Sequence, residues 1–341
     1  MKKIIKKTNE YLIIKDLAPV EAYLSTGCII LDLAIADRLP GGFGVGRISH
    51  VYGEESSAKT VLALEPLGSA QRQGGEAFFV DAEMTMDGER AKNLFGVDIS
   101  ELNYISTGNT ENLTVEWLFD TLIPECEKRA KENKRPIAIS IDSLSAIPSK
   151  NEMEETIDKA TYGTSRAKSL SKGFRKHIWE LAKTGTTMIF IDQARIDLNT
   201  LFTKRLTFSG GQALKFYAST RVIVKHQDDI KDKNENIIGI RVHFKVEKNK
   251  IAVPLRSGTF RLLFDYGIDY IGTSIEWLKY MNRFEWKGFY LILGEKFREL
   301  NKAISYVEEN NSEKELQEEV YNLWRETRQK LGATRKVRER C

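Results

Sequence analysis

The sequence predicts an α/β fold built on a mostly parallel central sheet. Short apolar runs alternate with segments of helix length between about residues 48 and 264. Near-continuous apolar strands of this kind indicate a parallel sheet covered by helices on both faces. Period-two alternation follows, and a helical, aromatic segment ends the chain. We therefore expect a short N-terminal arm over residues 1–24, an α/β core over residues 25–268, and a small C-terminal α+β domain with a basic tail over residues 269–341.

Four apolar runs predict the parallel strands of this sheet. They are Ile48–Tyr52, Ala77–Val80, Ile137–Ile141 and Thr187–Ile191. Farther along, residues 220–225 and 241–246 alternate in character and are joined by the polar stretch 227–236. This pattern predicts an antiparallel hairpin added to the edge of the sheet.

Composition excludes several classes of protein. With 41% apolar and 29% charged residues, the chain has the make-up of a folded globular protein. No 18-residue apolar stretch and no signal-cleavage pattern occur, so neither membrane spanning nor export is expected. Cys28, Cys126 and Cys341 lie far apart, which argues against a disulfide framework or a zinc site and favours a reducing cytoplasm. A net charge of +4 is too small to imply nucleic-acid binding by itself.

The stretch after the first predicted strand has the pattern of a phosphate-binding loop. Residues 53–60 match G-x-x-x-x-G-K-[ST], except that Ala58 replaces the second glycine. In such a loop, backbone N–H groups and a helix N-terminus hold the phosphates, the lysine reaches the β and γ phosphates, and the threonine hydroxyl binds Mg²⁺. The alternative is a chance glycine-rich turn. The expected nucleotide-binding residues are Gly53, Glu54, Glu55, Ser56, Ser57, Ala58, Lys59 and Thr60.

Two irregularities in this region carry physical predictions. If the second glycine position needs a positive φ, Ala58 costs about 1 kcal/mol there. Pro66 lies inside the helix that follows the loop, where proline removes one hydrogen bond and clashes with the preceding turn. We therefore expect that helix to be bent or short.

Polar side chains follow the next three strands, where ligands of open α/β sheets bind. Glu83 follows the second strand and is the candidate general base for the attacking water. Asp142 ends the third strand as a candidate Mg²⁺ ligand, and Gln193 ends the fourth as a candidate sensor of the γ-phosphate. The alternatives are that Asp81 or Glu83 caps the following helix, and that Asp142 is an ordinary strand end.

Several stretches resemble the RecA recombinase family over about residues 24–269. They are Ser25–Gly27 with Leu31–Asp32, Gly53–Thr60, Val80–Glu83, Ile141–Leu144, Ser209–Ser219 and Val246–Ala252. The last two separate recombinases from other P-loop enzymes. The stretches similar to the recombinases of tailed phages are Ser149–Glu152, Arg166–Lys168 with Phe174–Arg175, and Val246–Lys248. That branch also tolerates a residue other than glycine at position 58.

The resemblance implies a RecA-like P-loop ATPase core and an ATP-dependent recombinase. Such a protein forms helical filaments of its own copies on single-stranded DNA, pairs that strand with homologous duplex DNA, and hydrolyses ATP with Mg²⁺ in a DNA-dependent reaction. A single-strand-binding protein and a loading mediator are further partners that this activity implies. The implied location is the cytoplasm of a bacterial cell, a phage-infected host included.

The resemblance also implies roles for individual residues. Glu83 matches the water-activating glutamate, Asp142 the Mg²⁺-linked aspartate, and Gln193 the γ-phosphate sensor. Lys248 and Lys250 match a pair that reaches across a subunit interface into the neighbour's ATP site, where cations stabilise transition-state charge alongside Lys59. Asp87 matches an adenine-contacting aspartate, and Arg90 stands where an aromatic residue usually stacks.

Two loops, about residues 154–166 and 194–210, correspond to the DNA-binding loops of the family. They offer cations for phosphates and apolar groups that can wedge between bases. The candidate DNA-binding residues are Tyr162, Arg166, Arg195, Leu198, Phe202, Lys204, Arg205, Phe208, Gly210 and Gly211.

Three other functions remain open from the residues alone. The first is a ring helicase or another ATPase of the same core without strand exchange. The second is a recombination mediator that has lost hydrolysis, motivated by Ala58 and Pro66. The third is a nucleotide-binding structural protein.

Overall fold

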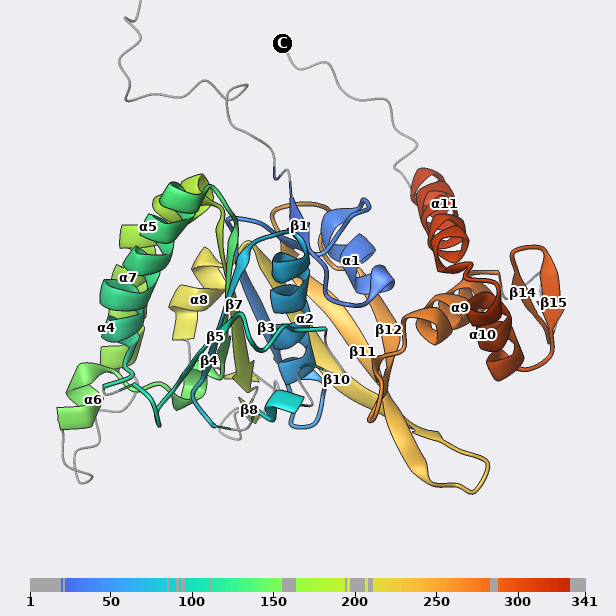
Figure 1. Cartoon of the computed structure of the whole chain (residues 1–341), viewed down its shortest axis with the longest axis horizontal. Helices are drawn as coiled ribbons and strands as arrows, with labels where there is room; N and C mark the ends of the chain where they lie inside the picture. Colours follow the sequence, from blue (N-terminus) through green and yellow to red (C-terminus); the bar gives the residue numbers. More distant parts are fainter. Residues whose placement is uncertain are drawn as a thin grey trace, which may run out of the picture.

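The computed structural model describes residues 20, 22–84, 86–89, 92, 96–110, 112–154, 164–193, 195–196, 206–207, 211–282 and 288–331. A nine-stranded sheet in the order β13-β12-β11-β10-β3-β7-β6-β4-β5 forms its centre (Figure 1). These strands are β3 (Ile48–Gly53), β4 (Glu76–Asp81), β5 (Leu102–Ser106), β6 (Ile137–Asp142), β7 (Thr186–Gln193), β10 (Thr220–Lys231), β11 (Ile237–Asn249), β12 (Ser257–Leu263) and β13 (Gly267–Ile268). The strands from β10 through β3 to β5 pair in parallel, and β10 to β13 pair antiparallel. The predicted α/β fold class is confirmed.

Helices cover both faces of this sheet, and alternate residues of the strands separate two apolar clusters. Ala77, Phe79 and Ile189 face one cluster, whereas Phe78 and Phe190 face the other. The first face carries α1 (Ile29–Ala36) and α2 (Lys59–Arg72). The second face is covered by α4 (Val115–Trp117), a π-helical turn at Leu118–Leu122, α5 (Ile123–Asn133), α7 (Thr164–Thr184) and α8 (Gly211–Tyr217). The two-sided burial explains why the parallel strands are nearly continuous apolar runs.

The hairpin differs from its prediction in two respects. Its strands are longer than expected, because the polar residues up to Lys231 still belong to β10. The turn itself is short and is held by Asp232, whose carboxylate accepts hydrogen bonds from the backbone N–H groups of Asn234 and Asn236. The hairpin also does not form the sheet edge, because β12 and β13 lie beyond it. Alternation of polar and apolar residues shows that one face of a strand is exposed, but it does not show whether further strands pair with the hairpin.

Helix α2 continues for 14 residues through Pro66, so the expectation of a short helix is wrong. The residues from Val61 to Ala70 are buried. Ser140 on β6 donates to the carbonyl oxygen of Ala63 at 2.6 Å in the turn that contains the proline. Burial of this whole segment offsets the missing N–H group of the proline.

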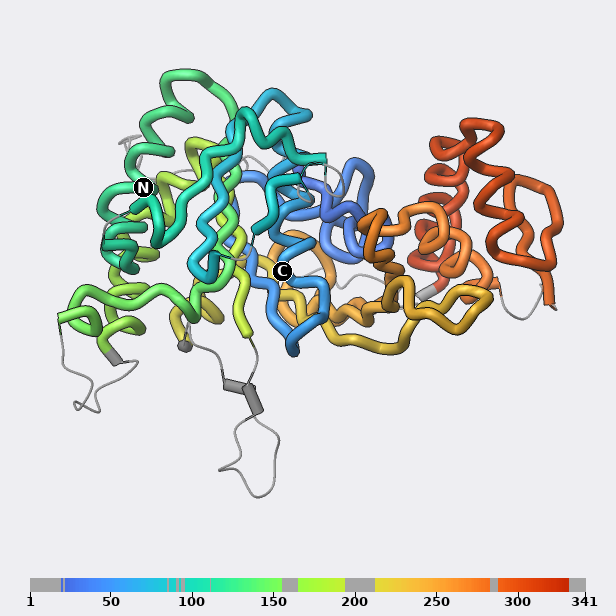
Figure 2. The backbone as a smooth tube through the Cα atoms, turned by 60° about the horizontal axis from the view of Figure 1, so that its bottom comes forward, coloured from blue at the N-terminus to red at the C-terminus, as the bar shows by residue number. Residues whose placement is uncertain are grey.

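The C-terminal elements lie beyond β12, at the opposite end of the molecule from α5 and α7 (Figure 2). They are α9 (Tyr270–Met281), β14 (Tyr290–Ile292), β15 (Glu295–Phe297), α10 (Leu300–Glu309) and α11 (Glu313–Leu331). Ile275, Val307 and Val320 belong to the same apolar cluster as the first face of the sheet. The predicted domain boundaries at residues 24 and 268 stay predictions.

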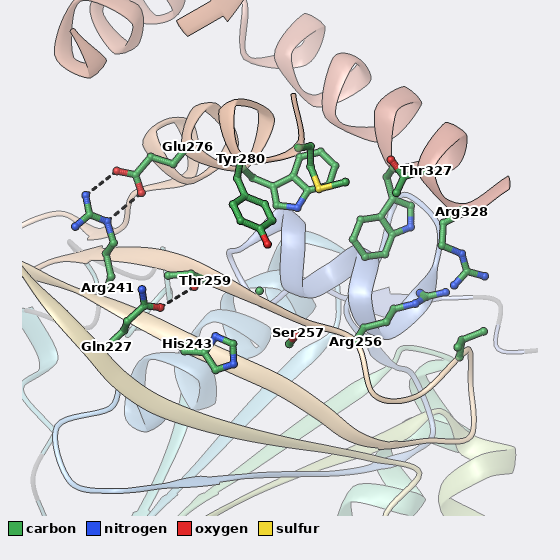
Figure 3. A pocket seen from close by; sticks show the side chains of 15 residues that line it. Gln227, Arg241, His243, Arg256, Ser257, Thr259, Glu276, Tyr280, Thr327 and Arg328 are labelled. Atoms are coloured by element: carbon green, nitrogen blue, oxygen red, sulfur yellow. Dashed lines mark hydrogen bonds and ion pairs between the residues drawn. The ribbon is translucent and has the colours of Figure 1, made fainter. Parts of the chain in front are cut away.

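One carboxylate ties α11 to the core. Asp37 accepts a hydrogen bond from Nε1 of Trp324 at 2.9 Å and pairs with Arg256 at 3.0 Å and Arg328 at 2.9 Å. A pocket of about 860 Å³ lies next to this cluster, between the strands of the hairpin side and helices α9 and α11 (Figure 3). Trp277, Trp324 and Tyr280 line it on the helical side.

The remaining elements are short, and they are β1 (Tyr23–Leu24), β2 (Phe43–Gly44), a 3-10 turn at Leu144–Ala146, α6 (Lys150–Glu154), β8 (Arg195–Ile196) and β9 (Leu206–Thr207). No helix among the described residues combines the length and the apolar character needed to cross a bilayer. Cys28 and Cys126 are buried free thiols, and Cys341 lies outside the described residues.

Candidate functional site

The predicted phosphate-binding loop joins β3 to α2 at the carboxyl edge of the sheet. A Cβ atom at Gly53 would lie 2.1 Å from the carbonyl oxygen of Val224, so only glycine fits beside β10 there. Within the loop, Ser57 Oγ donates to the carbonyl oxygen of Glu54 at 2.6 Å, and Nζ of Lys59 donates to the same carbonyl. Burial lowers the pKa of Lys59, and the carboxylates of Asp142, Glu55 and Glu83 oppose that shift. The loop thus turns back on itself in front of the helix N-terminus.

Ala58 has φ 64° and ψ 22°, which confirms that this position takes the left-handed conformation. A residue with a Cβ atom costs about 1 kcal/mol in this region, whereas glycine does not. The loop therefore stores strain at the position where the usual motif has glycine.

We expect Ala58→Gly to raise the free energy of unfolding by about 0.5–1 kcal/mol, because relief of the strained φ exceeds the entropy that glycine adds to the unfolded chain. Denaturant titration of the variant and the parent measures this difference. Ala182→Gly, at an exposed helical position in α7, is the matched control and loses about 1 kcal/mol. Equal losses at both positions would contradict stored strain at Ala58.

Thr60 and Asp142 lie together at the base of the loop. Oγ1 of Thr60 donates to Oδ2 of Asp142 at 2.6 Å. Burial raises the pKa of Asp142 from 3.8 to about 6; the Thr60 hydrogen bond and Lys59 lower it, and Glu83 raises it further. A hydroxyl oxygen beside a carboxylate is a donor set that suits Mg²⁺.

Glu83 lies two residues after the end of β4 and is held at the sheet edge. Ser143 Oγ donates to Glu83 Oε1 at 2.5 Å, and Ser143 in turn lies 2.6 Å from Ser145 Oγ. Its neighbour Asp81 is buried and accepts from the backbone N–H of Met86 at 2.8 Å and from the hydroxyl of Tyr104 at 3.0 Å. Of the two acids, Asp81 therefore organises the segment after the strand, through Met86, which lies outside a helix; that either acid caps the following helix stays a prediction.

Gln193 ends β7 in the register position opposite Gly53 on β3. The side chain of Gln193 is half-buried. The charges of Asp142, Glu83 and Asp192 all act on Lys59. The structure therefore brings the residues that the sequence predicted for this edge close together. They are Lys59 with Thr60, Glu83, Asp142 and Gln193.

Lys248 and Lys250 lie elsewhere in the chain. In the register of the sheet, Lys248 on β11 lies opposite Arg221 on β10, and Arg221 lies opposite His50 on β3. His50 stands three residues before Gly53. Three residues of strand correspond to about 10 Å, and β10 lies between β3 and β11. Neither lysine is thus brought to the phosphate-binding loop of its own chain.

The ammonium group of Lys248 caps the C-terminus of α8. Its Nζ donates to the carbonyl oxygens of Lys215 and Phe216, both at 2.8 Å. Desolvation lowers its pKa from 10.5 to about 8, and Lys250, Arg221 and Lys215 add to that shift. Lys250 is exposed. Sequence reasoning missed this capping role, because β11 and α8 are far apart along the chain.

A buried polar row next to Lys248 was also missed by the sequence analysis. Arg221 Nε donates to His50 Nδ1 at 3.2 Å, and His50 Nε2 lies 3.8 Å from Asp192 Oδ2. Arg221 also pairs with Glu247 at 3.6 Å, and the hydroxyl of Tyr52 donates to Glu247. Burial and the positive charge of Arg221 hold the pKa of His50 well below 6.5, so its ring is neutral. The period-two placement of His50 and Tyr52 inside an apolar strand was the available signal.

The remaining predicted residues are only partly covered by the structure. Asp87 is exposed next to the segment held by Asp81. Arg166 lies in the first turn of α7, and its Nη1 donates to the carbonyl oxygen of Ser145 at 2.9 Å. Arg195 lies on β8 and Gly211 begins α8. The predicted residues outside the described part of the chain are Arg90, Tyr162, Leu198, Phe202, Lys204, Arg205, Phe208 and Gly210.

Comparison with known proteins agrees with this arrangement. The model of the RecA N-terminal domain family matches residues 6–269. A RecA protein of Acidothermus cellulolyticus is 40% identical over 259 residues, which cover 76% of this chain and 70% of that protein. A RecA protein of Prochlorococcus marinus (strain SARG) is 35% identical over 294 residues, which cover 86% of this chain and 73% of that protein. The chain therefore belongs to the RecA family of recombinases, which are DNA-dependent ATPases.

Proposed function

We propose that this chain hydrolyses ATP at the sheet edge formed by β3, β4, β6 and β7, within filaments that it builds on single-stranded DNA. Those filaments then pair the bound strand with a homologous duplex. The observation that carries the proposal is the convergence of Lys59, Glu83, Asp142 and Gln193 at this edge.

The residues at this edge suit phosphoryl transfer to water. The N–H groups of residues 54–60 and the N-terminus of α2 suit the β and γ phosphates, and Lys59 supplies the positive charge among them. Glu83, oriented by Ser143, would accept the proton of the attacking water. Gln193, one strand away from the loop, would hydrogen bond to the γ-phosphate and relay its presence to the DNA loop that follows.

Thr60 and Asp142 fit a magnesium ion by the chemistry of their donor atoms. When bound, this ion would neutralise charge that develops on the phosphate oxygens. The chain's own contribution is to hold the hydroxyl and the carboxylate 2.6 Å apart at the start of α2.

The raised pKa of Asp142 gives a pH dependence with a defined sign. Because this pKa is about 6 in the folded chain, the carboxylate is ionised above pH 6 and becomes protonated as the pH falls through that value. We expect the apparent affinity for Mg²⁺ in ATP hydrolysis to fall between pH 7.5 and 5.5, and saturating Mg²⁺ to move the midpoint to lower pH. Mg²⁺ titrations at several pH values measure this effect. Asp142→Asn should leave only the pH dependence of ATP itself, whose terminal phosphate also titrates near pH 6. An equally small pH dependence in the parent protein would contradict the assignment.

For DNA binding we propose the segment of about residues 194–210, between β7 and α8. What supports this is the placement of its two ends: Gln193 precedes it at the nucleotide edge, and Gly211 follows it at the start of α8. Its Arg195, Lys204 and Arg205 would contact phosphates, while Leu198, Phe202 and Phe208 would stack against or wedge between bases. Lys248 and Lys250 would enter the ATP site of the neighbouring subunit, which makes hydrolysis depend on assembly.

ATP turnover with and without single-stranded DNA tests the proposed function. We expect hydrolysis to rise at least about tenfold when single-stranded DNA is added, because assembly completes the site. Equal rates in both conditions would refute a DNA-dependent site. Retained DNA binding without any hydrolysis would favour a mediator that has lost the reaction.

We further propose a relationship to the recombinases of tailed phages, supported by Ala58 and the stretches Ser149–Glu152 and Val246–Lys248. A single-strand-binding protein and a loading mediator are the partners that such a filament would need. We also propose the division into an arm of residues 1–24, a core of residues 25–268 and a C-terminal domain, supported by the end of the sheet at Ile268 and the start of α9 at Tyr270.

A further inference from the structure

The first turn of α7 is tied to the segment that follows β6. Ser165 Oγ and Ser149 Oγ lie 3.0 Å apart, and Arg166 Nη1 donates to the carbonyl oxygen of Ser145 at 2.9 Å. This turn forms the end of the first loop, about residues 154–166, that the family resemblance implies for DNA binding. These two contacts therefore hold the turn and residues 145–149 against each other.

The same segment holds the candidate general base. Ser145 Oγ lies 2.6 Å from Ser143 Oγ, and Ser143 donates to Glu83 at 2.5 Å. Three hydrogen bonds thus link Arg166 to Glu83 by way of Ser145: Arg166 binds the backbone carbonyl oxygen of that residue, whereas its side-chain hydroxyl contacts Ser143. The hydroxyls of Ser145 and Ser143 and the Glu83 carboxylate form one hydrogen-bonded chain whose members orient one another, and Arg166 acts on this chain by holding the backbone of Ser145.

Arg166 is placed for this role better than for a phosphate contact. Its side chain is only partly exposed, and Nη1 points to a backbone carbonyl within its own chain. Its Nε is buried as well and has no hydrogen-bond partner among the described residues. A residue that neutralises DNA phosphates instead presents its guanidinium group to solvent.

We propose that Arg166 is a positioning residue that couples the first DNA loop to Glu83 through Ser145 and Ser143. This inference rests on the proposed ATP hydrolysis and on a DNA-binding role for the first loop, about residues 154–166. Binding of single-stranded DNA next to α7 sets the first turn of that helix. The turn fixes Ser145, Ser143 then orients the Glu83 carboxylate toward the attacking water, and turnover rises.

Arg166→Met tests the coupling, because methionine keeps the apolar stem and removes every donor. We expect kcat at saturating single-stranded DNA to fall about tenfold, the factor that corresponds to one hydrogen bond of ordinary strength. The KM for ATP and the slope of log affinity for single-stranded DNA against log salt should stay at the parent values. Arg166→Lys retains one donor and should recover part of the lost kcat. The exposed Arg175→Met on the same helix is the matched control and should change neither quantity.

Two outcomes would overturn the proposal. If Arg166→Met leaves kcat unchanged but lowers the salt slope by about 0.7, Arg166 contacts one phosphate and does not act through Glu83. If Ser143→Ala and Arg166→Met lower kcat by factors that multiply in the double variant, the two residues act independently. Failure of the parent protein to respond to single-stranded DNA would instead refute the proposed function, which separates the two claims.

Discussion

Glu83→Gln should abolish ATP turnover while leaving ATP and single-stranded DNA binding at the parent level. The amide keeps the size of the side chain, and Ser143 can still donate to its oxygen, so the geometry of the sheet edge is retained. The amide cannot accept a proton from water, and loss of a general base of this kind costs about 10²–10⁴-fold in rate. Phosphate release in a coupled assay, together with nucleotide and DNA binding measurements, gives the comparison.

The control for this variant is the exposed Glu132→Gln on α5, which should behave as the parent does. Retained turnover in Glu83→Gln would remove Glu83 from the reaction. Loss of ATP binding together with turnover would instead make Glu83 a binding residue. The expected separation of binding from turnover therefore distinguishes the general-base role from both.

Lys248→Ala should suppress hydrolysis in assembled filaments by about 10²–10³-fold and leave the slow hydrolysis of the dilute, DNA-free chain unchanged. The size of the loss is that of removing one cationic or hydrogen-bonding group from a developing charge. Equal loss in the dilute chain would contradict action across the interface. Because Lys248 also caps α8, its loss can destabilise the fold. The thermal unfolding of Lys248→Ala is therefore compared with that of Lys245→Ala, which replaces an exposed lysine on the same strand.

Mixed filaments sharpen this test. In a 1:1 mixture of Glu83→Gln and Lys248→Ala subunits, an intact site forms wherever a Lys248→Ala subunit receives the lysine of a Glu83→Gln neighbour. For random assembly through head-to-tail interfaces this arrangement occurs at about a quarter of the sites, so about a quarter of the parent turnover should return. If Lys248 acted within its own chain, no site in the mixture would contain both residues, and no turnover would return.

Most of the nucleotide-binding edge could be predicted from the sequence, because each of its residues lies at or shortly after the end of a strand that is recognisable along the chain. Each of the four strands is a near-continuous apolar run, and a parallel sheet brings their carboxyl ends together. Lys59, Glu83, Asp142 and Gln193 could therefore be placed on one edge before their contacts were known. The positive φ of Ala58 follows in the same way from a motif that has glycine there.

Other features depend on contacts between distant segments, and local patterns do not report them. Lys248 caps α8 from 32 residues away, and Arg166 turns inward to Ser145 although its sequence position suggests a DNA contact. The uninterrupted α2 shows that burial can override proline within a helix. Strand β5 was not predicted, because Leu102–Ser106 is short and only partly buried.

Homologous pairing itself is the measurement that tests the central claim most directly. Single-stranded DNA coated with the parent protein, ATP and Mg²⁺ is incubated with a labelled duplex, and joint molecules are separated by gel electrophoresis. We predict joint molecules with a homologous duplex and none with an unrelated duplex of the same length, in a reaction that requires ATP. Robust DNA-dependent ATP hydrolysis with no joint molecules from the homologous duplex would contradict assignment of strand exchange to this chain.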